Sequence, residues 1–216
     1  MVKKLWEARP AIKRDSNLYK YEKFISKKFN KKFKNNYKNI LKWSIQNSDI
    51  FWNTIWDFCN VKGLKGKKKI KKSKTFYKNI FLPNSKLNFT ENLLSKDDHS
   101  KAITFISENG YREQRNWKSL KNNVEKLSFF LKKIQIKEKD RVAAYMPNIA
   151  ETVEAFLATL SLGAIWSSCS PDFGTSGVIE RFSQIKPKVL IIGEKYFYNG
   201  KEINVLERVP QILKKI

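Results

Sequence analysis

Residues 140–193 read DRVAAYMPNIAETVEAFLATLSLGAIWSSCSPDFGTSGVIERFSQIKPKVLIIG, and this stretch decides the fold. Three short apolar runs begin at Val142, Ala164 and Val189, and none of them contains a charge. Strands too hydrophobic to alternate, separated by helical patterns, are typical of a parallel sheet covered on both faces. The stretch therefore predicts a β-α-β-α-β unit with right-handed crossovers.

The two segments between these runs carry helix signals. From Ala150 onward, apolar side chains recur at the spacing of one helical face, and two glutamates occupy the first turn. Gly163 is expected to end this helix in the left-handed conformation. Thr175 or Ser176 is expected to cap a second helix that runs to about Ile185.

Upstream of this core the pattern predicts an antiparallel hairpin followed by a helix. Asn109-Gly110 is a strong turn signal between the segments 102–106 and 111–115. Apolar residues spaced four, three, four and three apart then predict a single core-facing helix over residues 117–133.

The amino-terminal part predicts helices as well. Ser48 is expected to cap a helix that begins at Asp49 and has a broad apolar face. Phe29, Phe33 and Tyr37 follow an i, i+4, i+8 spacing, which predicts that they share one helix.

The densest charge run of the chain covers residues 62–74, where eight of thirteen residues are lysine. Like charges repel and the run has no apolar period, so we expect a mobile, solvated loop that the fold does not need. A nuclear-localisation or phosphate-binding patch is the alternative interpretation.

The chain has 216 residues and a formal net charge of +24, with the excess concentrated at the start. Residues 1–100 carry 25 Lys+Arg against 8 Asp+Glu, whereas residues 141–193 carry four of each. A basic chain suggests nucleic acid or an anionic membrane surface as partner. The excess is almost all lysine, however, and accompanies abundant Asn, Ile and Phe. This composition favours compositional bias over a binding surface, so we expect no membrane partner and regard nucleic acid as the alternative.

The sequence offers few residues for a metal site or for histidine-based catalysis. Cys59 and Cys169 lie far apart without a second ligand at metal-binding spacing, and His99, the single histidine, lies in a polar segment. We therefore expect reduced thiols and no metal site. The start of the chain lacks the apolar core of a secretory signal, and the longest uncharged run, residues 155–171, is shorter than a membrane span. These features predict a cytoplasmic protein.

Five strings in the sequence carry a family resemblance. They are FLPNSKLNFTENLL at 81–94, DRVAAYMPN at 140–148, ETV at 151–153, GAIWSSCSPDFG at 163–174 and YFYNGK at 196–201. In this order they resemble the amino-terminal half of the adenylate-forming acyl-CoA synthetases, and within that family the acetoacetyl-CoA synthetases.

The resemblance implies an α/β protein in two parts. Residues 1–95 would form an amino-terminal helical region with the lysine-rich loop 62–74, and residues 96–216 the beginning of an AMP-binding domain with a hairpin and a partial parallel sheet. The family fold requires several hundred residues, so we expect a truncated chain whose carboxy-terminal portion is the missing partner. The implied reaction is that of an acetoacetate–CoA ligase, which converts ATP, acetoacetate and CoA to acetoacetyl-CoA, AMP and diphosphate. A ligase of another short acyl substrate is the alternative.

The resemblance also implies ATP, Mg²⁺ and CoA as ligands of the complete enzyme. The family binds the ATP phosphates with a Ser/Thr/Gly-rich loop that ends in lysine. The nearest string here, GTSG at 174–177, continues without the remaining threonine, glycine and lysine. We therefore assign no catalytic and no metal-binding residue, and expect the chain alone to be inactive.

CoA is the ligand whose binding surface begins within these residues, according to the resemblance. Phe173 and Gly174 stand where relatives place a turn beside the pantetheine, and Asn199 and Lys201 belong to a motif near the nucleotide of CoA. Gly174 permits close approach of a ligand to the backbone, and Lys201 offers a point charge for phosphate. Tyr198 stands where relatives often carry arginine, and an ordinary turn with a surface lysine remains the alternative interpretation.

Overall fold

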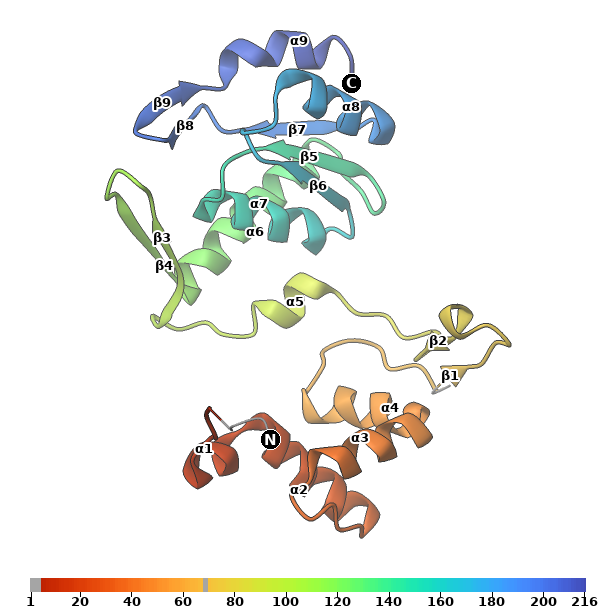
Figure 1. Ribbon diagram of the computed structural model, residues 1–216. Helices are drawn as coiled ribbons and strands as arrows, with labels where there is room; N and C mark the ends of the chain where they lie inside the picture. The colour runs from red at the N-terminus through yellow and green to blue at the C-terminus, as the bar shows by residue number, and fades with distance from the viewer. Residues whose placement is uncertain (1–4, 68–69) are drawn as a thin grey trace. The chain divides into compact units, whose positions relative to one another are not determined.

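A three-stranded parallel sheet confirms the predicted β-α-β-α-β unit (Figure 1). This computed structural model describes residues 5–67 and 70–216. The strands β5 (Arg141–Tyr145), β6 (Ile165–Cys169) and β7 (Val189–Ile192) lie in the order β6-β5-β7, so the first strand is central. β5 pairs in parallel with both neighbours.

Helices cover both faces of this sheet, which explains the absence of alternation in its strands. α7 (Ala150–Ser161) follows β5, and α8 (Thr175–Ile185) follows β6. Val142 of β5 belongs to a buried cluster with α6 (Trp117–Lys133) and α7, whereas Ala143 and Tyr145 belong to a second cluster with α8 and α9 (Val209–Leu213). Successive residues of β5 therefore point into two separate cores.

The structure places two helix N-caps at residues other than the predicted ones. Gly163 adopts a φ of +68° just after α7, as predicted. Neither Thr175 nor Ser176 caps α8, because Gly174 is the N-cap residue, with the extended φ and ψ that this position requires. Ser48 likewise is the first residue of α4 (Ser48–Phe58), and Asn47 precedes it as the N-cap.

The hairpin and helix before the core agree with the prediction. β3 (Lys101–Ile106) pairs antiparallel with β4 (Arg112–Asn116), and α6 (Trp117–Lys133) follows at once. The Asn116 side chain accepts a hydrogen bond from the backbone nitrogen of Ser119 at 2.7 Å and so caps α6.

The chain divides into one unit of residues 1–87 and a second unit of residues 88–216. α5 (Phe89–Leu93) belongs to the second unit because it packs on α7. The buried Thr90 hydroxyl donates to the carbonyl oxygen of Leu157 at 2.7 Å, which fixes α5 to the second unit.

The second unit ends in elements that the sequence patterns did not predict. β8 (Lys195–Tyr198) and β9 (Lys201–Asn204) form an antiparallel hairpin, followed by the 3-10 helix η2 (Leu206–Arg208) and by α9 (Val209–Leu213). Val205 and Ile212 are fully buried against α8 and β5, so this segment completes one of the two cores.

The first unit begins with α1 (Pro10–Asp15), α2 (Asn17–Phe29) and α3 (Tyr37–Gln46), which precede α4. The prediction of one helix through residues 29–37 is wrong. α2 ends at Phe29 and α3 begins at Tyr37, and Asn30, Lys34 and Asn35 between them have positive φ. Such left-handed residues interrupt a right-handed helix. The core of this unit is a cluster of buried side chains from several segments: Tyr21, Ile25, Phe33, Ile40 and Trp43.

The lysine-rich run is only partly a free loop. Leu64 and Lys86 exchange backbone hydrogen bonds of 2.7 and 2.8 Å, and Lys65 forms an ion pair with Asp57. β1 (Ile70–Lys71) then pairs antiparallel with β2 (Ile80–Phe81), with the 3-10 helix η1 (Phe76–Lys78) between them. The predicted mobility is therefore wrong for residues 64–65 and 70–71, which are paired, and residues 68–69 of the run lie outside the described residues.

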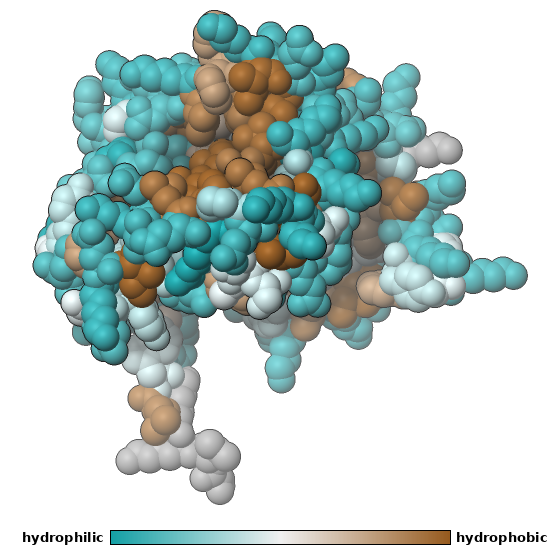
Figure 2. Space-filling view, turned by 90° about the horizontal axis from the view of Figure 1, so that it is seen from above, coloured by the Kyte–Doolittle hydropathy of each residue, from teal (hydrophilic) through white to brown (hydrophobic). Residues whose placement is uncertain are grey.

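Figure 2 is a space-filling view, seen from above relative to Figure 1. It shows hydrophobic side chains gathered within a rim of hydrophilic ones. Within the described part of the chain, β6 and β7 each pair with β5 alone, so each keeps one free edge. Ile165 of β6 is 49 % exposed. Among residues 5–67 and 70–216, no helix combines the length and the apolar character needed to cross a membrane.

Candidate functional site

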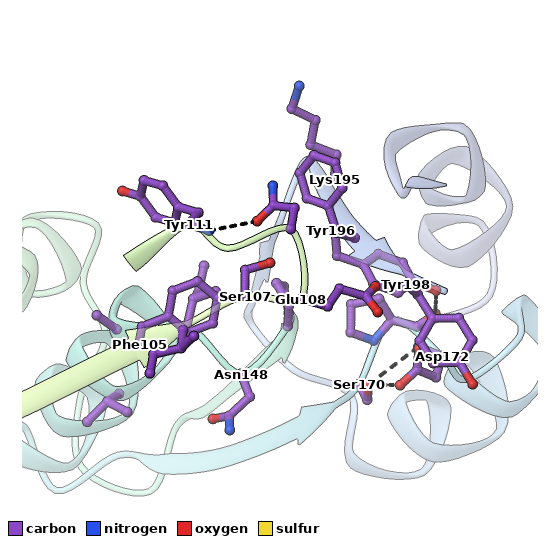
Figure 3. Close-up of a pocket in the computed structure, with 18 of the residues that line it drawn as sticks. Phe105, Ser107, Glu108, Tyr111, Asn148, Ser170, Asp172, Lys195, Tyr196 and Tyr198 are labelled. Atoms are coloured by element: carbon purple, nitrogen blue, oxygen red, sulfur yellow. Dashed lines mark hydrogen bonds between the residues drawn. The ribbon is translucent and has the colours of Figure 1, made fainter. Parts of the chain in front are cut away.

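A cleft of about 910 Å³ opens where β5 and β6 end (Figure 3). Ligands of open α/β sheets bind outside the carboxyl ends of the strands, next to the point where the strand order reverses. The residues that line the cleft come from four segments of the second unit: the β3–β4 hairpin (103–109 and Tyr111), the turn after β5 with the start of α7 (147–150 and Val153), the turn after β6 (170–172), and β8 (195–198).

A buried tyrosine holds the turn after β6 in place. Tyr145, the last residue of β5, is fully buried, and its hydroxyl oxygen lies 2.8 Å from the carbonyl oxygen of Phe173 and 3.1 Å from that of Pro171. A phenol has one proton, so it donates to one of the two carbonyls at a time. The sheet core thereby sets the position of the turn.

Arg208 of η2 completes this arrangement. Its Nη1 donates to the Tyr145 hydroxyl at 2.9 Å and to the Pro171 carbonyl oxygen, also at 2.9 Å. The bond to Tyr145 raises the pKa of Arg208 above its ordinary value, so the arginine remains charged. Tyr196 of β8 also donates to the Pro171 carbonyl oxygen, at 3.4 Å, which ties β8 to the same turn.

The interior of the cleft is aromatic and mildly acidic. Burial, and then the negative charge of Asp172, raise the pKa of Tyr196. Glu108 of the β3–β4 hairpin and Asp172 of the turn after β6 both line the cleft, and Figure 3 shows the Lys195 side chain pointing away from them. Lys195 forms an ion pair with Glu202 at 3.1 Å. The cleft interior therefore suits an uncharged group better than a phosphate.

The β3–β4 hairpin is fixed to the core by a charge cluster behind the cleft. Arg115 of β4 donates to Glu151 at 2.7 Å and to Glu154 at 2.9 Å, both on α7, and it also pairs with Glu113. Asn123 of α6 donates to the same Glu154 oxygen at 2.8 Å. The bond to Glu113 first, and then the bond to Glu154, raise the pKa of Arg115 above its ordinary value. The bonds to Glu151 and Glu154 hold the hairpin against α7.

Phe173 and Gly174, two of the residues proposed for CoA, lie in the turn between β6 and α8. The Phe173 ring is 40 % exposed, and the Arg181 guanidinium stands 4.5 Å from its centre, a cation–π contact. A Cβ added to Gly174 would meet nothing within 4 Å. The backbone conformation of Gly174 does not itself require glycine. The lack of a side chain instead leaves open space in front of this residue.

Asn199 and Lys201, the other two proposed residues, belong to the turn and second strand of the β8–β9 hairpin. Asn199 and Gly200 have φ values of 51° and 72°, the pair of left-handed residues that a two-residue hairpin turn requires. Lys201 is exposed and forms no ion pair with another residue that the structure describes. The Asn-Gly pair thus has a sufficient structural role, and Lys201 is free to meet an anion.

None of the four proposed residues lines the cleft, but both pairs adjoin residues that do. Pro171 and Asp172 precede Phe173, and Tyr196 to Tyr198 precede Asn199. The sequence interpretation missed these lining residues, and Asn148 with them. Asn148 and Ser170 could have been found, since each follows the end of a parallel strand, whereas the hairpin residues carry no such signal.

The string GTSG at 174–177 does not fit a loop that cradles phosphates. Thr175 to Gly177 already lie in α8, and a Cβ at Gly177 would lie 3.6 Å from the Phe173 ring, so the backbone here packs against protein. Among the described residues, no group of three His, Cys, Asp or Glu side chains is placed to hold a metal ion.

Comparison with known proteins identifies the family. Residues 94–215 match the AMP-binding enzyme family. The chain belongs to this family. It is 41 % identical over 174 residues to the acetoacetyl-coenzyme A synthetase of Rhizobium meliloti, covering 81 % of this chain and 27 % of that protein. It is 31 % identical over 179 residues to a malonamoyl-CoA synthetase of Penicillium aethiopicum, covering 79 % and 25 %.

A solved structure agrees with the sequence relatives. The acetoacetyl-CoA synthetase from Streptomyces lividans matches this AMP-binding chain with a TM-score of 0.92 and 26 % identity, over 99 % of this chain and 34 % of that one. The chain thus spans about a quarter to a third of the length of these relatives, in their amino-terminal part.

Proposed function

We propose that this AMP-binding chain is the amino-terminal part of an acetoacetate–CoA ligase and contributes the first contacts to CoA. The observation that carries the assignment is the 41 % identity to an acetoacetyl-coenzyme A synthetase over 81 % of the chain. The complete enzyme would consume ATP, with Mg²⁺, and acetoacetate and CoA, and would release acetoacetyl-CoA, AMP and diphosphate. A cytoplasmic role in lipid and ketone-body metabolism fits these substrates.

The residues in and around the cleft suit different parts of CoA. The aromatic interior, with Tyr196 and Tyr198, suits an uncharged part of the ligand, and the open space at Gly174 allows close approach to the backbone. Lys201, outside the cleft and without an ion pair among the described residues, suits a phosphate. CoA would supply the thiol that accepts the acyl group, and these residues would orient it.

Two substitutions test this placement by CoA binding to the chain, measured by calorimetry. Gly174→Val places a branched side chain where the structure leaves open space, at an ordinary φ of −62°, so the fold should be unchanged and CoA binding should fall about tenfold or more. Lys201→Gln should weaken binding about fivefold to tenfold because a charged contact to phosphate is lost.

Lys132→Gln, at an exposed position on α6 away from the cleft, is the matched control for Lys201→Gln and should leave CoA binding unchanged. CoA affinity that both Gly174→Val and Lys201→Gln leave at the wild-type value would contradict the placement. It would not contradict the family.

The ligase activity needs residues that this chain does not contain. The phosphate loop has no counterpart here, so acetoacetate-dependent release of pyrophosphate from ATP should be absent for the 216-residue chain, and the loss of transition-state charge stabilisation amounts to orders of magnitude in rate. Pyrophosphate release by this chain in a coupled assay would mean that an ATP site lies among the turns described above.

A ligase of another short acyl substrate is the second candidate, favoured by the similarity to a malonamoyl-CoA synthetase. The chain's own residues do not separate the two. Comparing acetoacetate with malonamate and acetate as substrates of the complete protein would decide between them.

A further inference from the structure

The first unit carries a hairpin whose tip projects apolar side chains. β1 and β2 pair through Ile70 with Phe81 and Lys71 with Ile80, and residues 72–79 connect them. We call residues 71–80 the basic hairpin. The Ser73 backbone nitrogen donates to the Asn79 side-chain oxygen at 2.8 Å, which closes the tip.

Its base is fixed to the core of the same unit. Phe81 packs edge-on against Trp52 of α4, with ring centres 5.9 Å apart. Lys65, just before the hairpin, donates to the carbonyl oxygen of Asn53 at 3.2 Å and pairs with Asp57. The tip therefore stands on a structured base, unlike the free end of a flexible loop.

Two adjacent aromatic side chains occupy the tip. Phe76 and Tyr77 are each 81 % exposed, the highest exposure of any aromatic residue in the described part of the chain, and Ile80 beside them is 50 % exposed. Single exposed apolar residues are ordinary, but a contiguous group on a projecting element marks a surface that binds something apolar.

Lysines surround these side chains without counter-charges. Lys71, Lys72, Lys74 and Lys78 are all exposed, and none forms an ion pair with another described residue. From residue 58 to residue 90 the sequence contains ten lysines and no acidic residue. The charge of the hairpin therefore favours an anionic partner. The exposed side chains at its tip favour a partner that also has an apolar part.

We propose that the basic hairpin docks this chain on membrane surfaces rich in anionic lipid, with Phe76 and Tyr77 in the headgroup region and the lysines against lipid phosphates. Aromatic side chains flanked by cations are the chemistry of the membrane–water interface, and clustered lysines recognise anionic leaflets. This proposal departs from the expectation of no membrane partner, and the experiment below decides between them.

Two features favour lipid over nucleic acid. Residues 58–90 contain no arginine, the side chain best suited to bidentate phosphate contacts and to stacking on bases. The aromatic pair also stands on a turn between strands of two residues each, which offers no sheet on which successive bases could stack.

The test is sedimentation of the complete chain with phosphatidylcholine vesicles, with and without about a third phosphatidylserine. Anionic vesicles should bind the chain at least tenfold more tightly than neutral ones, and binding should weaken as salt rises from about 0.1 M to about 0.5 M. Equal binding to both vesicle types would overturn the proposal.

Paired variants locate the contact. The double variant Phe76→Ser, Tyr77→Ser and the double variant Lys72→Gln, Lys74→Gln should each lose about tenfold or more in affinity for anionic vesicles. Since all four side chains are exposed, the fold should be unaffected, which far-ultraviolet circular dichroism checks.

The matched controls are Phe129→Ser, at a position 72 % exposed on α6, and the double variant Lys132→Gln, Lys133→Gln, which removes the same charge from the second unit. Both should bind vesicles as the wild type does. An equal loss in the Lys132/Lys133 variant would show that total charge alone drives binding and would overturn the proposal. So would tip variants that lose binding to a single-stranded oligonucleotide but keep binding to vesicles.

Discussion

The two units of the chain build their cores from different kinds of sequence. In the second unit, residues 141–193 carry four basic and four acidic side chains, and the strands and helices of that stretch supply most of its buried residues. In the first unit, residues 1–87 carry 24 Lys+Arg against 5 Asp+Glu, and a fully buried side chain, Phe33, lies between helices. Apolar patterning therefore locates the core strands of the second unit, whereas helical spacing misplaces Phe33 in the first unit.

The physical reason lies in where the backbone turns. A parallel strand buried on both faces must be apolar throughout, so its position is visible in the sequence. A bend such as residues 30–36 depends on Asn30, Lys34 and Asn35 adopting positive φ. Asparagine is enriched in this conformation, but most asparagines do not adopt it and lysine rarely does, so the sequence alone does not locate the bend. An aromatic residue in such a bend can be buried while its neighbours at helical spacing are exposed.

Phe33 and Tyr37 offer the strongest test of this comparison. Phe33→Ala should reduce the free energy of unfolding of the first unit by about 3–5 kcal/mol, because its ring is 1 % exposed and packs against Trp43 with ring centres 5.5 Å apart. Tyr37→Ala, at a position 59 % exposed, should change it by less than about 0.5 kcal/mol. Urea unfolding followed by tryptophan fluorescence measures both.

Phe182→Ala provides the corresponding change in the second unit, where the side chain is fully buried between α8 and β5. Its loss should again be about 3–5 kcal/mol, with amide exchange rising in the second unit only. Equal losses for Phe33→Ala and Tyr37→Ala would instead indicate one continuous helix, and the contrast between the units would disappear.

Most of the second unit could be predicted from the sequence. The strands near Val142, Ala164 and Val189, the turn at Asn109-Gly110 and the left-handed Gly163 are confirmed, since each follows from a local rule of burial or backbone geometry. The β8–β9 hairpin was missed although Asn199-Gly200 is an equally strong turn signal. Its strands have only four residues each, too few for alternation to be evident.

The site was less predictable than the fold. The resemblance pointed to the turn after β6 and to the β8–β9 hairpin, and both border the cleft. The side chains that position the turn after β6, Tyr145 and Arg208, are 63 residues apart in the chain, and only packing brings them together. No spacing or motif could indicate that pair.

Removing the Tyr145 hydroxyl tests how firmly the core sets the turn. Tyr145→Phe should cost about 1–2 kcal/mol, because Arg208 loses an acceptor and the carbonyls of Pro171 and Phe173 lose a donor in a buried place. Urea unfolding measures the cost, and amide exchange of residues 170–174 should rise more than that of β7.

Tyr198→Phe is the matched control, since Tyr198 is 59 % exposed and its loss of a hydroxyl should change stability little. If Tyr145→Phe left amide exchange in residues 170–174 unchanged, the turn would be positioned by Arg208 and the backbone alone.

The smallest effect expected concerns Asp57, which ties the start of the lysine-rich run to α4 in the first unit. Hydrogen bonds from Lys65 first, and then from Lys28 at 2.9 Å, lower the pKa of Asp57 below its ordinary value near 3.8. Between the lowered pKa and 3.8, the unfolded chain binds more protons than the folded one, so stability rises with pH in that window. The contribution is complete above about pH 4 and is lost as the pH falls through the folded pKa. The Asp57 side chain is 35 % exposed, so solvent limits the contribution to less than about 1 kcal/mol.

Asp57→Asn should remove this part of the pH dependence in acid titrations of urea unfolding, and Lys65→Gln should remove more of it than Lys28→Gln. An acid limb that Lys65→Gln leaves unchanged would mean that the lysine-rich run is not anchored at Lys65 in solution, and that the basic hairpin lacks the fixed base described above.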